Sequence, residues 1–167
     1  MSDDPLYSRL GFTDPEWGLL VGLPQSVLTA ASAATPDSSR KTRAEIAAGL
    51  DVVSDARASA SRLVSAVARA IVSRVGDPDL GEEPPVIEPS DPIAYAEDVL
   101  GRAAEANALL AAKAEPADAE TYKHWLVEIA ESVVGAASTG GLLGIGAEPV
   151  TDSERAFRDD LSRALKD

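Results

Sequence analysis

The chain has 167 residues, of which 45% are hydrophobic and only 4% aromatic, and its 28 acidic and 15 basic side chains give a net charge of −13. This charge argues against nucleic acid as a partner, because phosphate recognition needs a basic patch, and against attachment to an anionic membrane surface. The lack of cysteine excludes disulfides, thiolate metal sites and cysteine nucleophiles, and no apolar run approaches the ~20 residues of a membrane-spanning helix.

The charge balance also predicts the salt concentration in which the protein works. Acidic residues greatly outnumber lysines, and like charges at this density repel one another in dilute salt. Concentrated salt screens them, because the Debye length falls to about 3 Å at 1 M. We therefore expect a salt-adapted cytoplasm of the haloarchaeal kind, with a GC-rich bacterium as the alternative source. The acidic N-terminus lacks the apolar core of a signal peptide, which makes the cytoplasm the expected location.

The first predicted helix spans residues 15–34. Thr13 and Glu16 have capping-box spacing, and proline suits the first turn that follows. Pro24 lies inside this helix and should kink it, because it cannot donate a hydrogen bond to the carbonyl of Leu20. The inward-facing stripe is expected to be Leu19, Leu20, Leu23, Val27, Ala30 and Ala31.

The second predicted segment starts near residue 36 and extends to residue 75. Its apolar residues follow alternating steps of three and four, which is a seam of heptad type. Arg57 occupies one seam position, so the helix either breaks there or sends that side chain to the edge. One long helix and two shorter ones both fit, and the seam could be internal or pair between chains. The seam residues are Ile46, Leu50, Val53, Ala60, Val64, Val67 and Ile71.

Residues 76–92 form an acidic, proline-rich linker in which we expect no regular structure. Three further helices are predicted: one from Asp91, with Pro92 in its first turn, one over residues 117–138, and one over residues 152–165. The expected inward residues of the three are Tyr95, Val99, Ala103, Ala106 and Leu110, then Tyr122, Trp125, Leu126, Ile129, Val133, Ala136 and Ala137, then Phe157, Leu161 and Leu165.

Two of these helices resemble each other. Residues 20–32 align without gaps on residues 126–138. The simplest account is a duplicated helical hairpin, with repeat 1 at about 13–75 and repeat 2 at about 93–167; the alternative is chance similarity between alanine-rich helices. Ser26 and Ser132 would then be equivalent, each bonded to a carbonyl one turn earlier or placed at a close helix contact; the alternative is a paired functional site. Trp17 and Trp125 are expected to anchor the core.

The stretch STGGLLGIG, Ser138–Gly146, is the most unusual local feature. A phosphate-binding loop needs a lysine and then Ser or Thr after its last glycine, whereas Ala-Glu-Pro follows here. A dinucleotide fingerprint needs a preceding strand, and here a helix is predicted. We therefore interpret this stretch as a loop with three apolar residues, Leu142, Leu143 and Ile145. They either pack on the bundle or contact a partner.

A second candidate site is a row of His124, Glu128 and Glu131 on the fourth predicted helix. This row lies opposite the stripe through Trp125 and Ile129, so we expect it to face solvent. A di-metal bundle site needs inward glutamates from several helices and Glu-x-x-His pairs, which the chain does not supply. These three residues remain candidates for a surface metal only. The sequence has one histidine and no GxSxG motif, so it offers few of the residues that nucleophilic catalysis needs.

The pattern of Trp125–Ser138, Gly140, Val150 and Glu154 resembles the tellurite-resistance-type (TerB-like) helical domain. That resemblance covers about a quarter of the chain. In this family an acidic residue before the glycine contributes to a metal-binding acidic patch, but Thr139 takes its place here. The segment is also similar to helical proteins of halophiles and actinobacteria.

Together these observations predict a single all-α domain over residues 1–167, a bundle of five to six helices. The leading hypothesis is a non-enzymatic interaction or structural protein of a salt-adapted cytoplasm, with no cofactor, that contacts a protein partner or a second copy through Leu142–Ile145. The alternative is a helical module that binds a divalent cation or small ligand through His124, Glu128 or Glu131. An enzyme that uses carboxylates alone would need a deep pocket with two facing acids.

Overall fold

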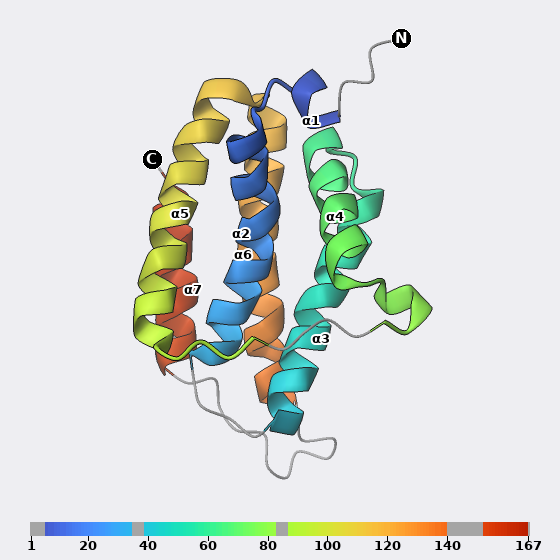
Figure 1. The fold of residues 1–167 in the computed structure, drawn as a ribbon. Helices are drawn as coiled ribbons and strands as arrows, with labels where there is room; N and C mark the ends of the chain where they lie inside the picture. The colour runs from blue at the N-terminus through green and yellow to red at the C-terminus, as the bar shows by residue number, and fades with distance from the viewer. Residues whose placement is uncertain (1–5, 35–38, 83–86, 140–151, 167) are drawn as a thin grey trace.

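All regular elements of the computed structural model are helical across the residues that it describes, 6–34, 39–82, 87–139 and 152–166. This confirms the predicted all-α bundle (Figure 1). The proposed duplication of a hairpin stays a prediction. The long helices are α2 (Asp14–Ala33), α3 (Ser39–Asp55), α4 (Arg62–Val75), α5 (Pro92–Lys113), α6 (Pro116–Thr139) and α7 (Asp152–Ala164), and a short α1 (Leu6–Arg9), which was not predicted, precedes them.

Helix α2 begins at the predicted capping box. The backbone nitrogen of Thr13 donates to Glu16 Oε2 over 2.9 Å, and that of Glu16 donates to Thr13 Oγ1 over 3.4 Å. These two bonds satisfy donors that the first turn of a helix otherwise leaves free. The helix then continues through Pro24 to Ala33.

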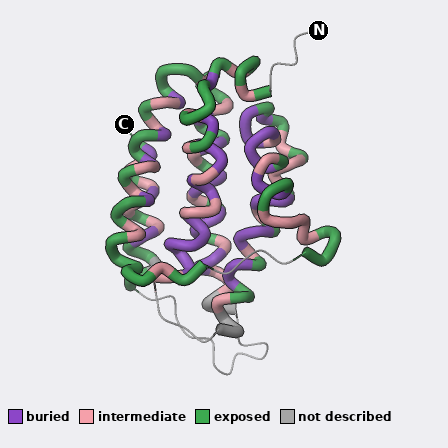
Figure 2. Tube along the Cα trace, viewed as in Figure 1, coloured by how far each residue is buried: buried purple, intermediate pink, exposed green. Residues whose placement is uncertain are grey.

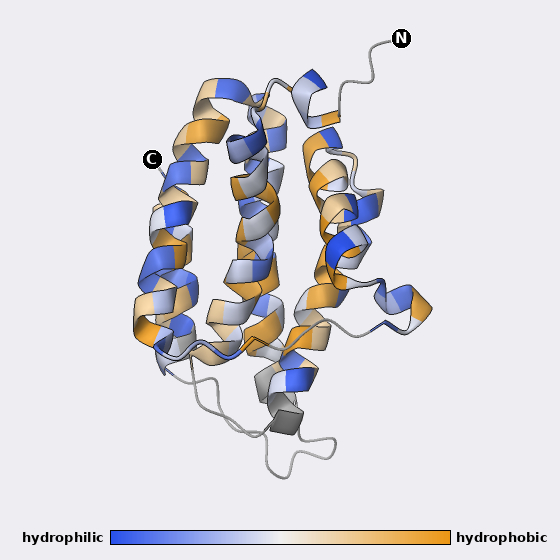
Figure 3. Ribbon diagram, in the orientation of Figure 1, coloured by the Kyte–Doolittle hydropathy of each residue, from blue (hydrophilic) through white to orange (hydrophobic). Residues whose placement is uncertain are grey.

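The centre of the bundle is α2. It packs against α5 and α6 and also contacts α3, α4 and α7, so buried residues occur around most of its circumference (Figure 2). Along the helices, hydrophobic and hydrophilic residues follow one another in bands, as expected for amphipathic helices (Figure 3). The core is therefore one continuous cluster that draws on all six long helices.

Most residues predicted to face inward are buried. The exceptions among the described side chains are Leu19, Tyr95 and Ala136, which are half-buried. Both tryptophans belong to the core, as predicted: Trp17 stacks on Tyr7 of α1, and Trp125 meets Tyr122 edge to face. Because the core has few aromatic residues, these pairs supply much of its bulk at the α1 end of the bundle.

The predicted seam forms two helices rather than one. Helix α3 ends at Asp55, a single 3-10 turn, η1 (Ala56–Ala58), follows, and α4 begins after the N-cap Ser61, whose hydroxyl accepts from the nitrogen of Val64. The chain reverses its course at this elbow (Figure 1). The seam is internal, because its apolar members are buried, apart from Ala60 within the elbow.

The linker departs from its prediction at one point. Residues Pro78–Leu80 form a 3-10 turn, η2, where no regular structure was expected. The side chain of Asp77 caps this turn by accepting from the nitrogen of Asp79 over 3.0 Å, and Gly81 ends it in the left-handed region, at φ 74°. The prediction was wrong there because a proline in a first turn starts such a helix instead of breaking it.

Candidate functional site

The interaction surface predicted at Leu142, Leu143 and Ile145 lies outside the described residues, as do Gly140 and Val150 of the TerB-like pattern. What the structure places are the two ends of this connection. Helix α6 ends at Thr139 and α7 begins at Asp152, and the two helices pack against each other. Residues 140–151 therefore connect two helices that pack on each other, whereas residues 114–115 alone connect α5 to α6.

The row of His124, Glu128 and Glu131 lies on the exposed side of α6, opposite the buried Trp125 and Ile129, as the helical spacing predicts. The structure separates this row into two parts. His124 and Glu128 line a hollow beside α3, whereas Glu131 lies beyond it. Across the described parts of the chain, no three His, Asp or Glu side chains are grouped so that they could hold a metal ion.

That hollow, which we call the α3–α6 groove, has a volume of about 280 Å³. It lies where the end of α3, the elbow and the start of α4 meet the middle of α6. The indole nitrogen of Trp125 points to the carbonyl of Val52 across its floor, at 3.5 Å. The residues that line it are Val52, Asp55, Ala56, Ser59, Val64, Thr121, His124, Trp125 and Glu128.

The chemistry of the α3–α6 groove is an apolar floor beneath a polar rim. Two carboxylates, from Asp55 and Glu128, and the imidazole of His124 come from two helices that are distant in sequence, and hydroxyls of Ser59 and Thr121 complete the rim. Such a rim suits a small cationic group more than an anion, because its two acidic members are carboxylates that attract positive charge. The sequence could not pair Asp55 with His124, since only the packing of α3 on α6 brings them together.

A second hollow, of about 380 Å³, lies on the other side of His124, between α6 and α7. Its rim carries both signs of charge: Lys123 forms an ion pair with Glu120, with 2.7 Å between Nζ and Oε1, and Lys166 lies across from them. The imidazole of His124 therefore lies on the ridge between an acidic groove and a mixed one. This double position is the most distinctive feature of the candidate site.

The pair Ser26 and Ser132 has a structural role in both positions. Ser26 donates to the carbonyl of Gly22, one turn earlier, over 3.0 Å and accepts from Arg102 Nη1 of α5 over 3.1 Å. Ser132 donates across a helix contact to the carbonyl of Ala48 on α3, over 3.0 Å. The two structural outcomes named for these serines are thus both found, one at each position.

One buried carboxylate was missed by the sequence reasoning. Glu45 of α3 is only 1% exposed, and its Oε2 accepts from the hydroxyl of Ser32 on α2 over 3.0 Å. It lies one position, about 100° around the helix, from Ile46 of the seam, and spacing alone does not distinguish it from Ala47 on the other side of Ile46, which is exposed.

Comparisons with protein-family models, with curated proteins and with solved structures returned no match. The resemblance to the tellurite-resistance domain therefore stays a prediction. Among the helices as described, none is long and apolar enough to cross a bilayer.

Proposed function

We propose that this chain is a non-enzymatic helical protein that acts by binding another protein, in a salt-adapted cytoplasm. The observation that carries this proposal is the connection of residues 140–151 between α6 and α7. Neighbouring helices of a bundle are usually joined by about 2–8 residues, and longer loops are commonly functional. In the same bundle, Ala114 and Glu115 suffice to join α5 to α6.

The composition of this connection indicates an apolar contact. Leu142, Leu143 and Ile145 fall within a few residues of one another, with glycines on both sides. The buried centre of a protein–protein contact is more apolar than its rim, and burial there contributes roughly 25 cal/mol per Å² of apolar surface. The net charge of −13 supports the salt-adapted setting, and concentrated salt favours contacts of this kind, because it screens repulsion between acidic surfaces.

A photo-crosslinking amino acid at position 143 tests this function. Introduced in place of Leu143 and irradiated in a lysate of the source cells at their native salt, it should give a discrete adduct with one protein, identified by mass spectrometry. The matched control carries the same group at Ala111, which is exposed on α5. Adducts from neither position, or the same diffuse set from both, would contradict the proposal.

The α3–α6 groove favours a second candidate, a module that binds a small cationic ligand or divalent cation. Asp55, His124 and Glu128 line this groove from two helices. Because no three such side chains of the described residues are grouped to hold a metal ion, a small organic cation is the favoured ligand, and a divalent cation would have to bind through one or two of them. Calorimetric titration in concentrated salt with Ca²⁺, Mg²⁺, Zn²⁺, Mn²⁺ and spermidine tests it. One of these probes should bind, E128Q should weaken that binding by at least an order of magnitude, and E131Q, which lies outside the groove, should not. No heat from any probe, or equal weakening by both variants, would rule this candidate out.

A further inference from the structure

The elbow at residues 56–61 interrupts the seam without any helix-breaking residue. Its sequence, Ala-Arg-Ala-Ser-Ala-Ser, contains neither glycine nor proline, and alanine and arginine are among the strongest helix formers. The seam positions from Ile46 to Ile71 also keep their steps of three and four across the break, with Arg57 as the polar member among apolar ones, which is the register of one continuous helix. The seam register and the alanines therefore favour a straight helix here, whereas the two serines favour the break through local bonds: Ser61 Oγ accepts from the nitrogen of Val64 and Ser59 Oγ from that of Ser61. Contacts with residues outside the elbow add to the bend.

Arg57 supplies four of those contacts. Its Nε donates to the carbonyl of Ser54 over 2.9 Å, and its Nη2 donates to the hydroxyl of Ser54 over 2.6 Å. The same guanidinium reaches past the elbow to the turn η2, where Nη1 donates to Asp77 Oδ2 over 2.8 Å and Nη2 to Asp79 Oδ2 over 2.7 Å. One side chain thus joins the end of α3 to the segment that follows α4.

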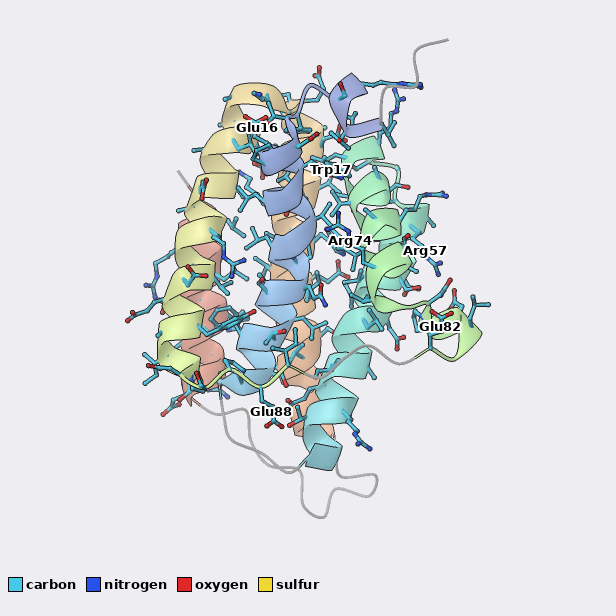
Figure 4. The ribbon with its side chains drawn as sticks, in the orientation of Figure 1. Glu16, Trp17, Arg57, Arg74, Glu82 and Glu88 are labelled. Atoms are coloured by element: carbon cyan, nitrogen blue, oxygen red, sulfur yellow. The ribbon has the colours of Figure 1, made fainter. Side chains whose placement is uncertain are left out.

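Two further contacts keep the elbow bent. The carbonyl of Arg57, which a continuous helix would pair with a backbone nitrogen, accepts instead from the hydroxyl of Ser65 over 2.8 Å. The hydroxyl of Ser61 donates to Asp118 Oδ1 of α6 over 2.6 Å. Figure 4 shows Arg57 on the outer side of the α3–α4 pair, above the turn that carries Glu82.

We propose that the elbow is a hinge through which two copies of this chain exchange halves. Straightening residues 56–61 would make one helix over residues 39–75 and would carry α1–α3 away from α4–α7 of the same chain. The half α1–α3 of each copy would then pack on α4–α7 of the second copy. Exchange of this kind is a low-cost route to a dimer, because it remakes the contacts of the monomer between chains.

The interfaces of the bundle fit this exchange. The contacts of α2 with α5 and α6, and of α3 with α6, all join the first half to the second, so each can be remade between copies without exposing the core. The straightened helix gains the backbone hydrogen bonds that the elbow lacks and keeps its apolar seam in register. The proposal does not depend on the leading function proposed above, since residues 140–151 take no part. Straightening would reshape the α3–α6 groove, because Ala56 and Ser59 of the elbow line it.

The variant R57L tests the hinge, since it removes the four hydrogen bonds and places an apolar residue at the seam position. The matched control is R57L/A60P. Ser59 already has φ −58° and ψ 143°, a conformation favoured before proline, whereas a proline at position 60 cannot lie inside a straight helix. Light scattering after size exclusion should show the dimeric fraction of R57L at least tenfold above that of the wild type, and R57L/A60P should return to monomer.

A distance measurement identifies the kind of dimer. Because the chain has no cysteine, spin labels can be attached at A47C and S73C, two exposed positions on α3 and α4. After refolding with excess unlabelled chain, the distance within one R57L chain should lengthen to about 39 Å, at about 1.5 Å per residue of straight helix. In the wild type and in R57L/A60P it should stay clearly shorter.

Three results would overturn the proposal. The first is that R57L stays monomeric with the wild-type distance, and the second is a dimer in which that distance remains short. The third is loss of the helical circular-dichroism signal by both R57L and R57Q, because the exchanged state keeps every helix and does not need the Arg57 contacts.

Discussion

The hydroxyl of Tyr122 on α6 donates a hydrogen bond to the carbonyl of Leu20 on α2 over 2.8 Å. That carbonyl is the one that Pro24 cannot serve, because proline has no backbone N–H to donate one turn back. Tyr122 is fully buried, and this burial raises the pKa of its hydroxyl, which stays protonated as a donor. The proline inside α2 and the tyrosine inside α6 therefore form one structural unit.

This unit predicts a double-mutant cycle. Y122F should lower the free energy of unfolding by about 1–3 kcal/mol, because it leaves a buried carbonyl without a donor. In a P24A background the same change should cost clearly less, since the nitrogen of residue 24 can then donate to Leu20. Urea titrations of the four proteins measure this. An equal cost of Y122F in both backgrounds would show that the two residues are not coupled.

Alanine substitutions at two glycines should differ in their effect on the free energy of unfolding. A methyl group at Gly49 of α3 would lie 2.7 Å from Leu28 Cδ1 and 3.1 Å from Val133 Cγ2, whereas one at Gly101 of α5 would meet nothing within 4 Å. G101A should stabilise by up to ~1 kcal/mol through helix propensity. G49A should be about 1–3 kcal/mol less stable than G101A, because overpacking opposes that gain.

Denaturant unfolding of both glycine variants checks this. Equal stabilisation by the two would mean that α2, α3 and α6 do not meet as closely at Gly49 as the structure shows.

Glu16 should make the free energy of unfolding depend on pH in the acidic range. The hydrogen bond from Lys113 Nζ, 2.7 Å away, and the one from the nitrogen of Thr13 lower the pKa of Glu16 below its usual value of 4.5, against a smaller opposing effect of burial. The unfolded chain then binds more protons than the folded one as pH falls below about 4.5. The stabilisation is complete above that pH and is lost as pH falls through the lowered pKa.

The measurement is the urea midpoint of the wild type, E16Q and E97Q between pH 6 and pH 3. E16Q should lose part of the fall that the wild type shows, and E97Q, which replaces an exposed glutamate of α5, should retain it. The control is needed because protonation also relieves repulsion across the whole acidic chain. Parallel curves for the wild type and E16Q would contradict the role given to the Lys113 contact (Figure 4 labels Glu16).

Salt should stabilise this protein. At a net charge of −13, screening removes self-repulsion of the folded state, and each ~1 kcal/mol gained is worth about 2–4 °C in Tm for a domain of this size. We expect a rise of about 5 °C or more between dilute and molar KCl in a calorimetric scan. A Tm that is flat or falls over this range would count against the salt-adapted setting.

Much of the fold follows from local sequence. The capping box of Thr13 and Glu16, the start of α5 at Asp91 and Pro92, and the inward stripes of α5, α6 and α7 all act within one helix, so spacing alone predicts them. The elbow could not be predicted in the same way, because Arg57 holds it through hydrogen bonds to residues twenty or more positions away in the sequence. For that reason the sequence alone does not decide whether residues 36–75 form one helix or two.

The candidate site shows the same limit. Helical spacing placed His124 and Glu128 on one exposed face of α6, but Asp55 joins them only through the packing of α3 on α6. Glu45 was missed because nothing in its neighbourhood marks it as buried except its place beside the seam. Contacts between helices carry this information, and periodicity within one helix does not.

Thiol accessibility at the connection between α6 and α7 tests the proposed function most directly. The chain has no cysteine, so L142C, L143C and I145C can each be reacted alone with a maleimide in concentrated KCl, beside the exposed control A111C and the buried control V133C. A surface available to a partner predicts reaction rates within an order of magnitude of that of A111C. Protection of all three positions to the level of V133C would show that these side chains are packed within the monomer and would contradict the proposal.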